Sequence, residues 1–160
     1  MIKPFSEMPL NSRIWIYQSN RKFINLELED INIKISNFLI NWTAHGSDLF
    51  SSYEIKYDRF IIIALDESHN SAGGCSIDSC VHFIQELEKD HEINLLDKMN
   101  VTFKQGDYIT YKSIEDFKIL IKNKSISDKT IVFNNLVVDI EDLNKNWEVS
   151  AGMSWHSRFF

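Results

Sequence analysis

The residue types best suited to chemistry gather in residues 66–82, where a polar loop follows an apolar stretch and leads into a helical pattern. Gly73 and Gly74 are followed directly by Cys75, and Cys80 comes one turn later. A thiol beside a helix N-terminus can have a lowered pKa, and the free amides there can bind an anion. This segment indicates a place for chemistry without identifying a reaction.

Two interpretations of this helix start remain open. In the first, Ser76 is the N-cap, Asp78 complements the helix dipole, and Cys75 and Cys80 pack together as a hydrophobic staple. In the second, Cys75 is a nucleophile or the loop is an anion cradle, because paired glycines allow a ligand to approach the backbone closely. The ligand-binding residues of that second interpretation are Gly73, Gly74, Ser76, Ser79 and Ser47.

Two histidines are candidate general bases. Asp78, His82 and Glu86 are spaced four residues apart, which places them on one face of the predicted helix. That spacing fits a carboxylate that orients an imidazole, and it also fits an ordinary solvated stripe. His45 is predicted in the last turn of the preceding long helix, and it is the better partner for Cys75 on geometry alone.

Hydrophobic periodicity gives the elements that must position these residues. The first predicted elements are a strand at 13–18 and a long helix, which has Asn25 as its N-cap, an apolar face from Ile24 to Trp42 and Gly46 as its C-terminal stop. Strands at 48–57 and 60–65, a helix at about 77–91 and a hairpin at 101–104 and 108–111 follow. The last elements are a helix capped by Ser113, a strand at 130–138 with an interruption at 134–135 as an alternative, and a helix at 139–146. This order predicts an α+β fold: a ferredoxin-like α/β sandwich with a mostly antiparallel sheet and two long helices on one face. We expect a single domain, with residues 1–112 as its core and residues 113–160 as a C-terminal α/β extension. In that topology residues 42–48 face residues 66–80 at one edge.

Composition limits the classes of function. The net charge of −6 argues against bulk nucleic-acid binding, and no apolar run is long enough to cross a membrane. The first residues lack the apolar core of a signal peptide, so we expect a cytoplasmic protein with reduced cysteines. The spacing of Cys75 and Cys80 is not a zinc pattern, and no metal or other cofactor is expected.

The C-terminal segment is rich in aromatic residues between Trp155 and Phe160. Such side chains must be buried, either on the same chain or against a second copy, so a homodimer through residues 155–160 is one expectation. His156 and Arg158 could then reach the polar edge.

Three groups of segments carry a resemblance to a known family: residues 10–21, residues 41–47 with 74–79, and residues 130–136 with 154–159. Together they resemble a small family of uncharacterised bacterial proteins that are often labelled "ABC transporter ATPase". The resemblance covers nearly the whole chain and implies no catalytic residues. The five glycines never form the phosphate-binding loop G-x-x-x-x-G-K-[ST], so the residues themselves predict no ATPase activity.

The function expected from the sequence is binding of a small anionic ligand or a protein partner where residues 42–48 meet residues 66–82, without catalysis. One alternative is a thiol-dependent hydrolase or acyl transferase with Cys75 as nucleophile and His45 as base. A second alternative is a structural homodimer.

Overall fold

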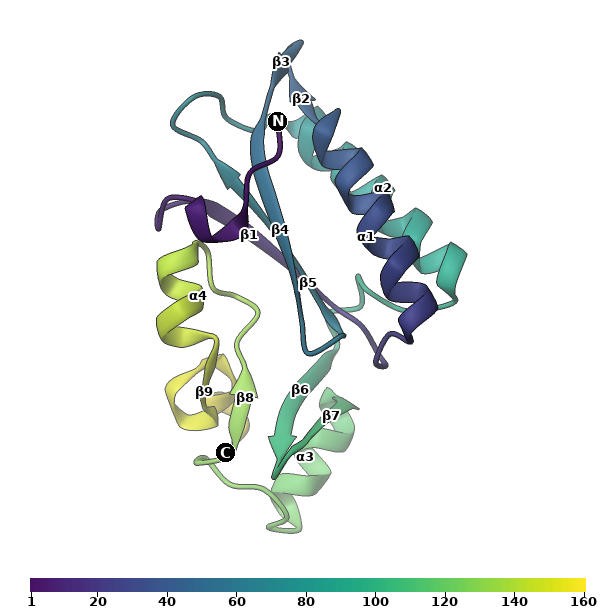
Figure 1. Cartoon of the computed structure of the whole chain (residues 1–160). Helices are drawn as coiled ribbons and strands as arrows, with labels where there is room; N and C mark the ends of the chain where they lie inside the picture. The colour runs from purple at the N-terminus through teal and green to yellow at the C-terminus, as the bar shows by residue number, and fades with distance from the viewer. The chain divides into compact units, whose positions relative to one another are not determined.

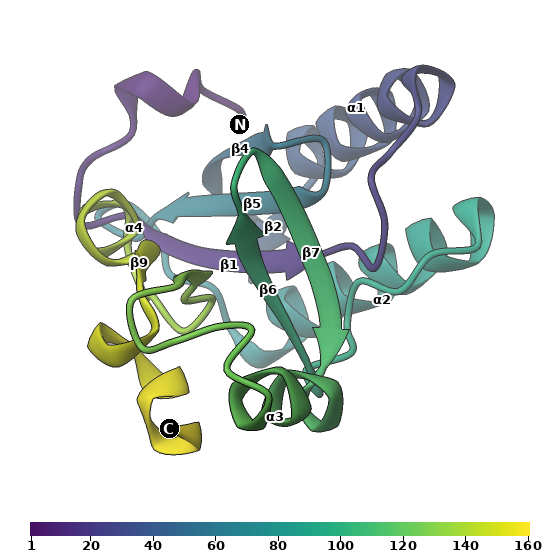
Figure 2. The same cartoon turned by 90° about the horizontal axis from the view of Figure 1, so that it is seen from below.

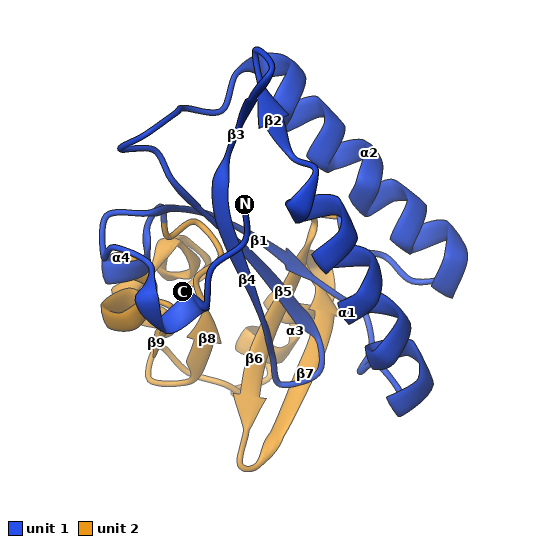
Figure 3. Ribbon diagram, turned by 45° about the horizontal axis from the view of Figure 1, so that its top comes forward, with its two compact units in different colours: residues 1–96, 138–141 blue, residues 97–137, 142–160 orange.

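A computed structural model describes all residues, 1–160, and divides the chain into two compact units (Figure 3). The first unit comprises residues 1–96 and 138–141, and the second comprises residues 97–137 and 142–160. The predicted boundary at residue 112 therefore falls inside the second unit. Each unit has its own hydrophobic core, so each is described separately.

The sheet of the first unit has three antiparallel strands in the order β1-β5-β4. Their bounds are Arg13–Gln18 for β1, Phe50–Lys56 for β4 and Phe60–Asp66 for β5. The central strand, β5, is buried along its whole length and has a strand neighbour on each edge. The turn between β4 and β5 places Tyr57 and Asp58 in the left-handed region.

Two long helices cover one face of this sheet, as Figure 1 shows. They are α1 (Asn25–Ile40) and α2 (Gly74–His91). Ile31, Ile35 and Leu39 recur at helical spacing on α1 and are fully buried against the sheet. The predicted N-cap of α1 was Asn25, but the structure places the cap at Ile24, whose amide donates to the Glu27 carboxylate.

Ion pairs link α1 with α2 and with the loop that precedes α1. Arg21 makes a bidentate pair with Glu27 at 2.8 and 2.7 Å, which lowers the pKa of that carboxyl to about 2. His91 Nε2 lies 2.7 Å from a carboxylate oxygen of Asp30, which Lys34 also contacts. These pairs connect the start of α1 with the end of α2.

The second unit contains a four-stranded sheet in the order β7-β6-β8-β9. Its strands are β6 (Asn100–Gln105), β7 (Tyr108–Ser113), β8 (Ile131–Phe133) and β9 (Glu148–Ser150). The helix α3 (Ile114–Lys122) begins after Ser113, whose hydroxyl accepts from the Asp116 amide at 3.1 Å, so this predicted capping residue is confirmed. The predicted strand at 130–138 ends at Phe133, because the chain turns at 134–136, where the sequence left an interruption open.

The C-terminal segment folds onto the core of the second unit. After α4 (Ile140–Asn146) and β9 come two short 3-10 helices, Ala151–Met153 and Trp155–Phe159. Figure 2 shows this segment at the C-terminal end of the chain. Phe117 from α3 meets the rings of His156, Phe159 and Phe160 at 5.9–6.2 Å between centroids. His156 is therefore buried in this unit and does not take part in the predicted polar edge.

The α+β class is confirmed by this mixture of helices and antiparallel sheets. The order β1-β5-β4 matches three strands of a ferredoxin-like sheet. The fourth strand of that topology would be β6, but β6 pairs with β7 and β8 in the other sheet, so the ferredoxin-like arrangement is not confirmed. No helix combines the length and the hydropathy that a membrane span requires.

Candidate functional site

The start of α2 differs from the predicted one. The helix begins at Gly74, and its first intrahelical bond runs from the Ile77 amide to the Gly73 carbonyl at 3.0 Å. Gly73 is the N-cap, so no side chain caps the helix. Ser76 was expected in that role, but its hydroxyl instead donates to the Thr43 carbonyl at 3.0 Å and its side chain is buried.

His45 also occupies a different element from the one predicted. The helix α1 ends at Ile40, and the chain then forms a hairpin of β2 (Thr43–Ala44) and β3 (Ser47–Asp48). His45 and Gly46 are its two loop residues, with φ values of 52° and 78°. Positive φ at both central positions defines the type I′ turn that two-residue hairpins favour. The prediction failed because Gly46 was interpreted as a helix C-cap, whereas it supplies the second position of this turn.

Hydrogen bonds attach the hairpin and its base to the loop and first turn of α2. Trp42 Nε1 donates to the Ser76 carbonyl at 2.9 Å, next to the bond from Ser76 to Thr43. Asn70 Nδ2 lies 3.3 Å from the carbonyl oxygens of both Ala44 and Ser47. Because each segment donates hydrogen bonds to the other, the hairpin and the start of α2 are held in a fixed arrangement.

This attachment places the His45 imidazole against the glycines. A Cβ atom added to Gly73 would lie 3.5 Å from His45 Nε2, and one added to Gly74 would meet nothing within 4 Å. The residues predicted to converge, His45 with Gly73 and Gly74, thus lie at one edge. Ser47 contributes its carbonyl, which accepts from Asn70, and its side chain is exposed.

The electrostatics of this helix start favour negative charge. The first turn of α2 contains no acidic residue, whereas α3 has Glu115 and Asp116 in its first turn. The amides of Gly74, Cys75 and Ser76 have no hydrogen-bond partner in the structure. The free amides and the helix dipole together give this end a partial positive charge.

The two cysteines have separate environments, so they do not form the expected staple. Cys75 is exposed in the first turn of α2, and no hydrogen bond joins it to His45 or His82. Cys80 is buried, with its Sγ 3.7 Å from the Tyr17 hydroxyl. Burial raises the pKa of the Cys80 thiol to about 11 and also raises the pKa of Tyr17.

We therefore expect iodoacetamide to modify only Cys75 in the folded protein. Cys80 should react only after denaturation, because its sulfur is enclosed and its thiolate is disfavoured. Mass spectrometry of the labelled peptides, with Cys75→Ser as the control, measures this. Native labelling of Cys80 at a rate similar to that of Cys75 would contradict the buried environment.

The three residues predicted to share one face of α2 lie on its solvent side. Asp78, His82 and Glu86 are exposed, and no ion pair or hydrogen bond connects them. Ser79 donates to the Ser76 carbonyl at 2.8 Å.

Ser79 also lines a hollow of about 590 Å³ with residues of α1 and α2. Phe38 and Phe83 in the lining stack with their ring centroids 4.6 Å apart.

Asp66 closes the buried strand and is held by its own loop. Its carboxylate accepts from the amide and the hydroxyl of Ser68 at 3.0 and 2.6 Å. These bonds, aided by His69 at 3.8 Å, lower the pKa of Asp66 below its usual value. No cluster of three or more His, Cys, Asp or Glu side chains that could hold a metal is present.

Sequence reasoning missed the two side chains that fix the site. Asn70 lies in a polar loop where nothing in the sequence singles it out. Trp42 was predicted as part of the apolar face of α1, and its indole nitrogen carried no separate signal. Comparisons of the chain with family models, with curated proteins and with solved structures gave no match.

Proposed function

We propose that the chain binds a small anionic group, such as a phosphate or carboxylate, between the first turn of α2 and His45. The observation that carries the proposal is the position of His45 Nε2, 3.5 Å from where a Cβ of Gly73 would lie, since Gly73 directly precedes the three residues with free amides. Glycine at 73 and 74 leaves the backbone open to a ligand. Helix N-termini with free amides are common anion sites in proteins.

The amides and the imidazole have different tasks in this proposal. The amides of Gly74, Cys75 and Ser76 donate to the anion, and the helix dipole adds to the attraction. His45 contributes a further ring N–H from the opposite side. Because hydrogen bonds from Trp42 and Asn70 already fix the two segments, little ordering accompanies binding.

The proposal is tested by titrating the protein with inorganic phosphate and measuring the dissociation constant by calorimetry. Replacing His45 with Ala should weaken binding about tenfold, since one charge-assisted hydrogen bond contributes about 1.5 kcal/mol. His82→Ala is the matched control, because His82 is an exposed histidine that no hydrogen bond joins to Cys75. It should leave the dissociation constant unchanged.

Two results would overturn the proposal. One is phosphate binding that His45→Ala and His82→Ala weaken equally, because binding would then follow net charge. The other is no binding at millimolar phosphate. His45→Gln, which keeps a donor at similar reach, should restore part of the affinity.

The sequence alternatives receive less support. A thiol-dependent hydrolase would need a base in contact with Cys75, and neither His45 nor His82 makes that hydrogen bond. A homodimer through residues 155–160 was expected in order to bury the terminal aromatic residues, but Trp155 and Phe159 already pack against the core of the second unit.

A further inference from the structure

The outer edge of β4 offers backbone groups that have no partner. Ser51 already uses its outward groups, because its amide donates to the Met1 carbonyl and its carbonyl accepts from the Lys3 amide, both at 2.9 Å. Outward and inward groups alternate along a strand, so Tyr53 and Ile55 also direct their N–H and C=O groups outward. No hydrogen bond from these four groups to another segment is present.

The N-terminal segment shows that this edge accepts an added strand. Ile2 forms a parallel bridge with Ser51, and the segment then leaves β4 at Pro4, which has no N–H to continue the ladder. The 3-10 helix Phe5–Glu7 follows at once. The pairing therefore stops after one bridge, and the edge remains open from Tyr53 onward.

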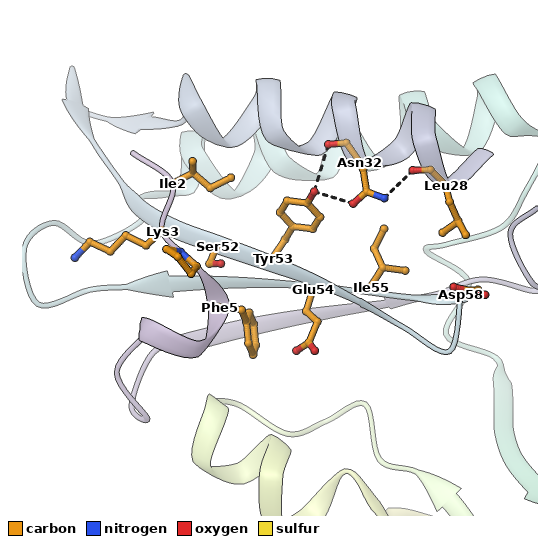
Figure 4. Close-up of a pocket in the computed structure, with 11 residues that line it drawn as sticks. Ile2, Lys3, Phe5, Leu28, Asn32, Ser52, Tyr53, Glu54, Ile55 and Asp58 are labelled. Carbon is orange, nitrogen blue, oxygen red and sulfur yellow. Dashed lines mark hydrogen bonds between the residues drawn. The ribbon is translucent and has the colours of Figure 1, made fainter. Parts of the chain in front are cut away.

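A hollow of about 480 Å³ lies along this open edge (Figure 4). Its wall toward α1 is apolar and fixed: Leu28 and Ile55 pack on the core, and the Tyr53 hydroxyl donates to Asn32 Oδ1 at 2.8 Å. The wall toward α1 and the edge strand thus belong to regular elements that pack on the core of the first unit. A peptide could add there without a rearrangement of the unit.

The two sides of the edge differ in chemistry. Figure 4 shows the side chains of Tyr53 and Ile55 directed toward α1, and those of Glu54 and Phe5 directed to the opposite side. Lys3 extends away from the middle of the hollow, so Glu54 and Asp58 are the nearer charges. Their ion pairs, with Lys56 at 3.7 Å and Lys22 at 4.0 Å, are long and accessible to solvent, and pairs of that kind contribute little.

From these contacts we propose that the edge of β4 binds an extended peptide segment of a partner protein, with apolar and basic residues in alternation. The peptide backbone pairs with Tyr53 and Ile55. Its apolar side chains face Leu28 and Ile55, and its basic side chains pair with Glu54 and lie over the Phe5 ring. The length from Tyr53 to Lys56 accommodates about four residues of the peptide.

A second copy of this chain fits the edge less well in the register that uses all of its free groups. Because the outward groups of Ser51 are already bonded, that register pairs Tyr53 of each copy with Ile55 of the other, and it places the two Glu54 carboxylates directly opposite each other on one face. Like charges in that position destabilise a strand pair. A basic peptide replaces this repulsion with attraction.

The test uses a blocked Lys-Val-Lys-Val-Lys peptide as the probe and the ¹⁵N-labelled full chain. We expect its addition to shift the amide signals of Tyr53 and Ile55 and to slow their hydrogen exchange. Ile55→Pro removes one outward N–H, which an edge strand tolerates, and should weaken binding about tenfold relative to Ile55→Ala. The Ala variant is the matched control, because it loses the same packing and keeps the N–H.

Glu54→Lys provides an independent test that leaves the backbone ladder intact. This variant should bind a blocked Glu-Val-Glu-Val-Glu peptide better than the lysine peptide, reversing the preference of the natural chain. An unchanged preference, or lysine-peptide shifts located away from β4, would overturn the proposal. Concentration-dependent self-association that Ile55→Pro abolishes would also overturn it, by showing that a second copy occupies the edge.

Discussion

Replacing Phe117 with Ala should lower the free energy of unfolding of the second unit by about 3–5 kcal/mol. The Phe117 side chain is fully buried, and Phe103, His156, Phe159 and Phe160 surround its ring at 5.4–6.2 Å between centroids. The substitution removes the ring around which the C-terminal segment packs. A loss of that size is comparable with the whole stability of a small domain.

Chemical denaturation followed by circular dichroism measures this loss, and ¹⁵N spectra show which residues lose their native signals. Ile119→Ala on the same helix is the matched control. Ile119 is 53% exposed, so that variant should change stability by no more than about 0.5 kcal/mol. Equal effects of the two substitutions would contradict the packing around Phe117.

Acidification should destabilise the second unit through His156. The side chain is fully buried, Nδ1 lies 2.6 Å from the Ser154 hydroxyl, and Nε2 has no partner. Burial, aided by the charge of Arg158, lowers the pKa of His156 from 6.5 to about 4. The unfolded chain therefore takes up a proton at a higher pH than the folded chain does.

The sign of the effect follows from this order of pKa values. The contribution of uncharged His156 to the free energy of unfolding is fully present above pH 6.5 and decreases as the pH falls. At pH 4 the free energy of unfolding is lower by about 3 kcal/mol. Glu27 and Asp66, whose pKa values are lowered from 4.5 and 3.8, begin to lose their contributions only near those pH values. Most of the His156 effect therefore develops at higher pH than the carboxylate effects.

Hydrogen exchange of Phe103 and Val132 in the second sheet, measured between pH 7 and pH 4, gives the stability of this unit. His156→Gln should remove most of the pH dependence in that window, because the new side chain does not titrate. His82→Gln, which changes an exposed histidine, should leave the dependence in place. A pH profile that His156→Gln does not alter would contradict the assignment to this residue.

Local sequence signals predicted much of the fold. The continuous apolar run of β5, the helical spacing of Ile31, Ile35 and Leu39, and the cap at Ser113 each depend on neighbouring residues, and each is present in the structure. Pairings between distant strands could not be predicted in this way. The pairing of β6 with β8 depends on packing between segments far apart in the chain. This pairing places β6 in the sheet of the second unit, whereas the expected topology placed it in the first sheet.

The candidate site was predicted in position and not in detail. The expected ferredoxin-like topology placed residues 42–48 opposite residues 66–80, and the bonds from Trp42 and Asn70 show that these two segments are in contact. The roles of Ser76 and His45 were wrong, because serine and glycine fit both caps and turns. Only the tertiary contact of Ser76 with Thr43 decides between those roles.

The central claim is that an anion binds at the first turn of α2. The most direct measurement is a ¹⁵N spectrum of the full chain during titration with inorganic phosphate at constant ionic strength. The account predicts that the amide signals of Gly74, Cys75 and Ser76 shift most and saturate together, and that His45→Ala reduces these shifts. Absent shifts at these amides, or larger shifts elsewhere on the chain, would contradict it.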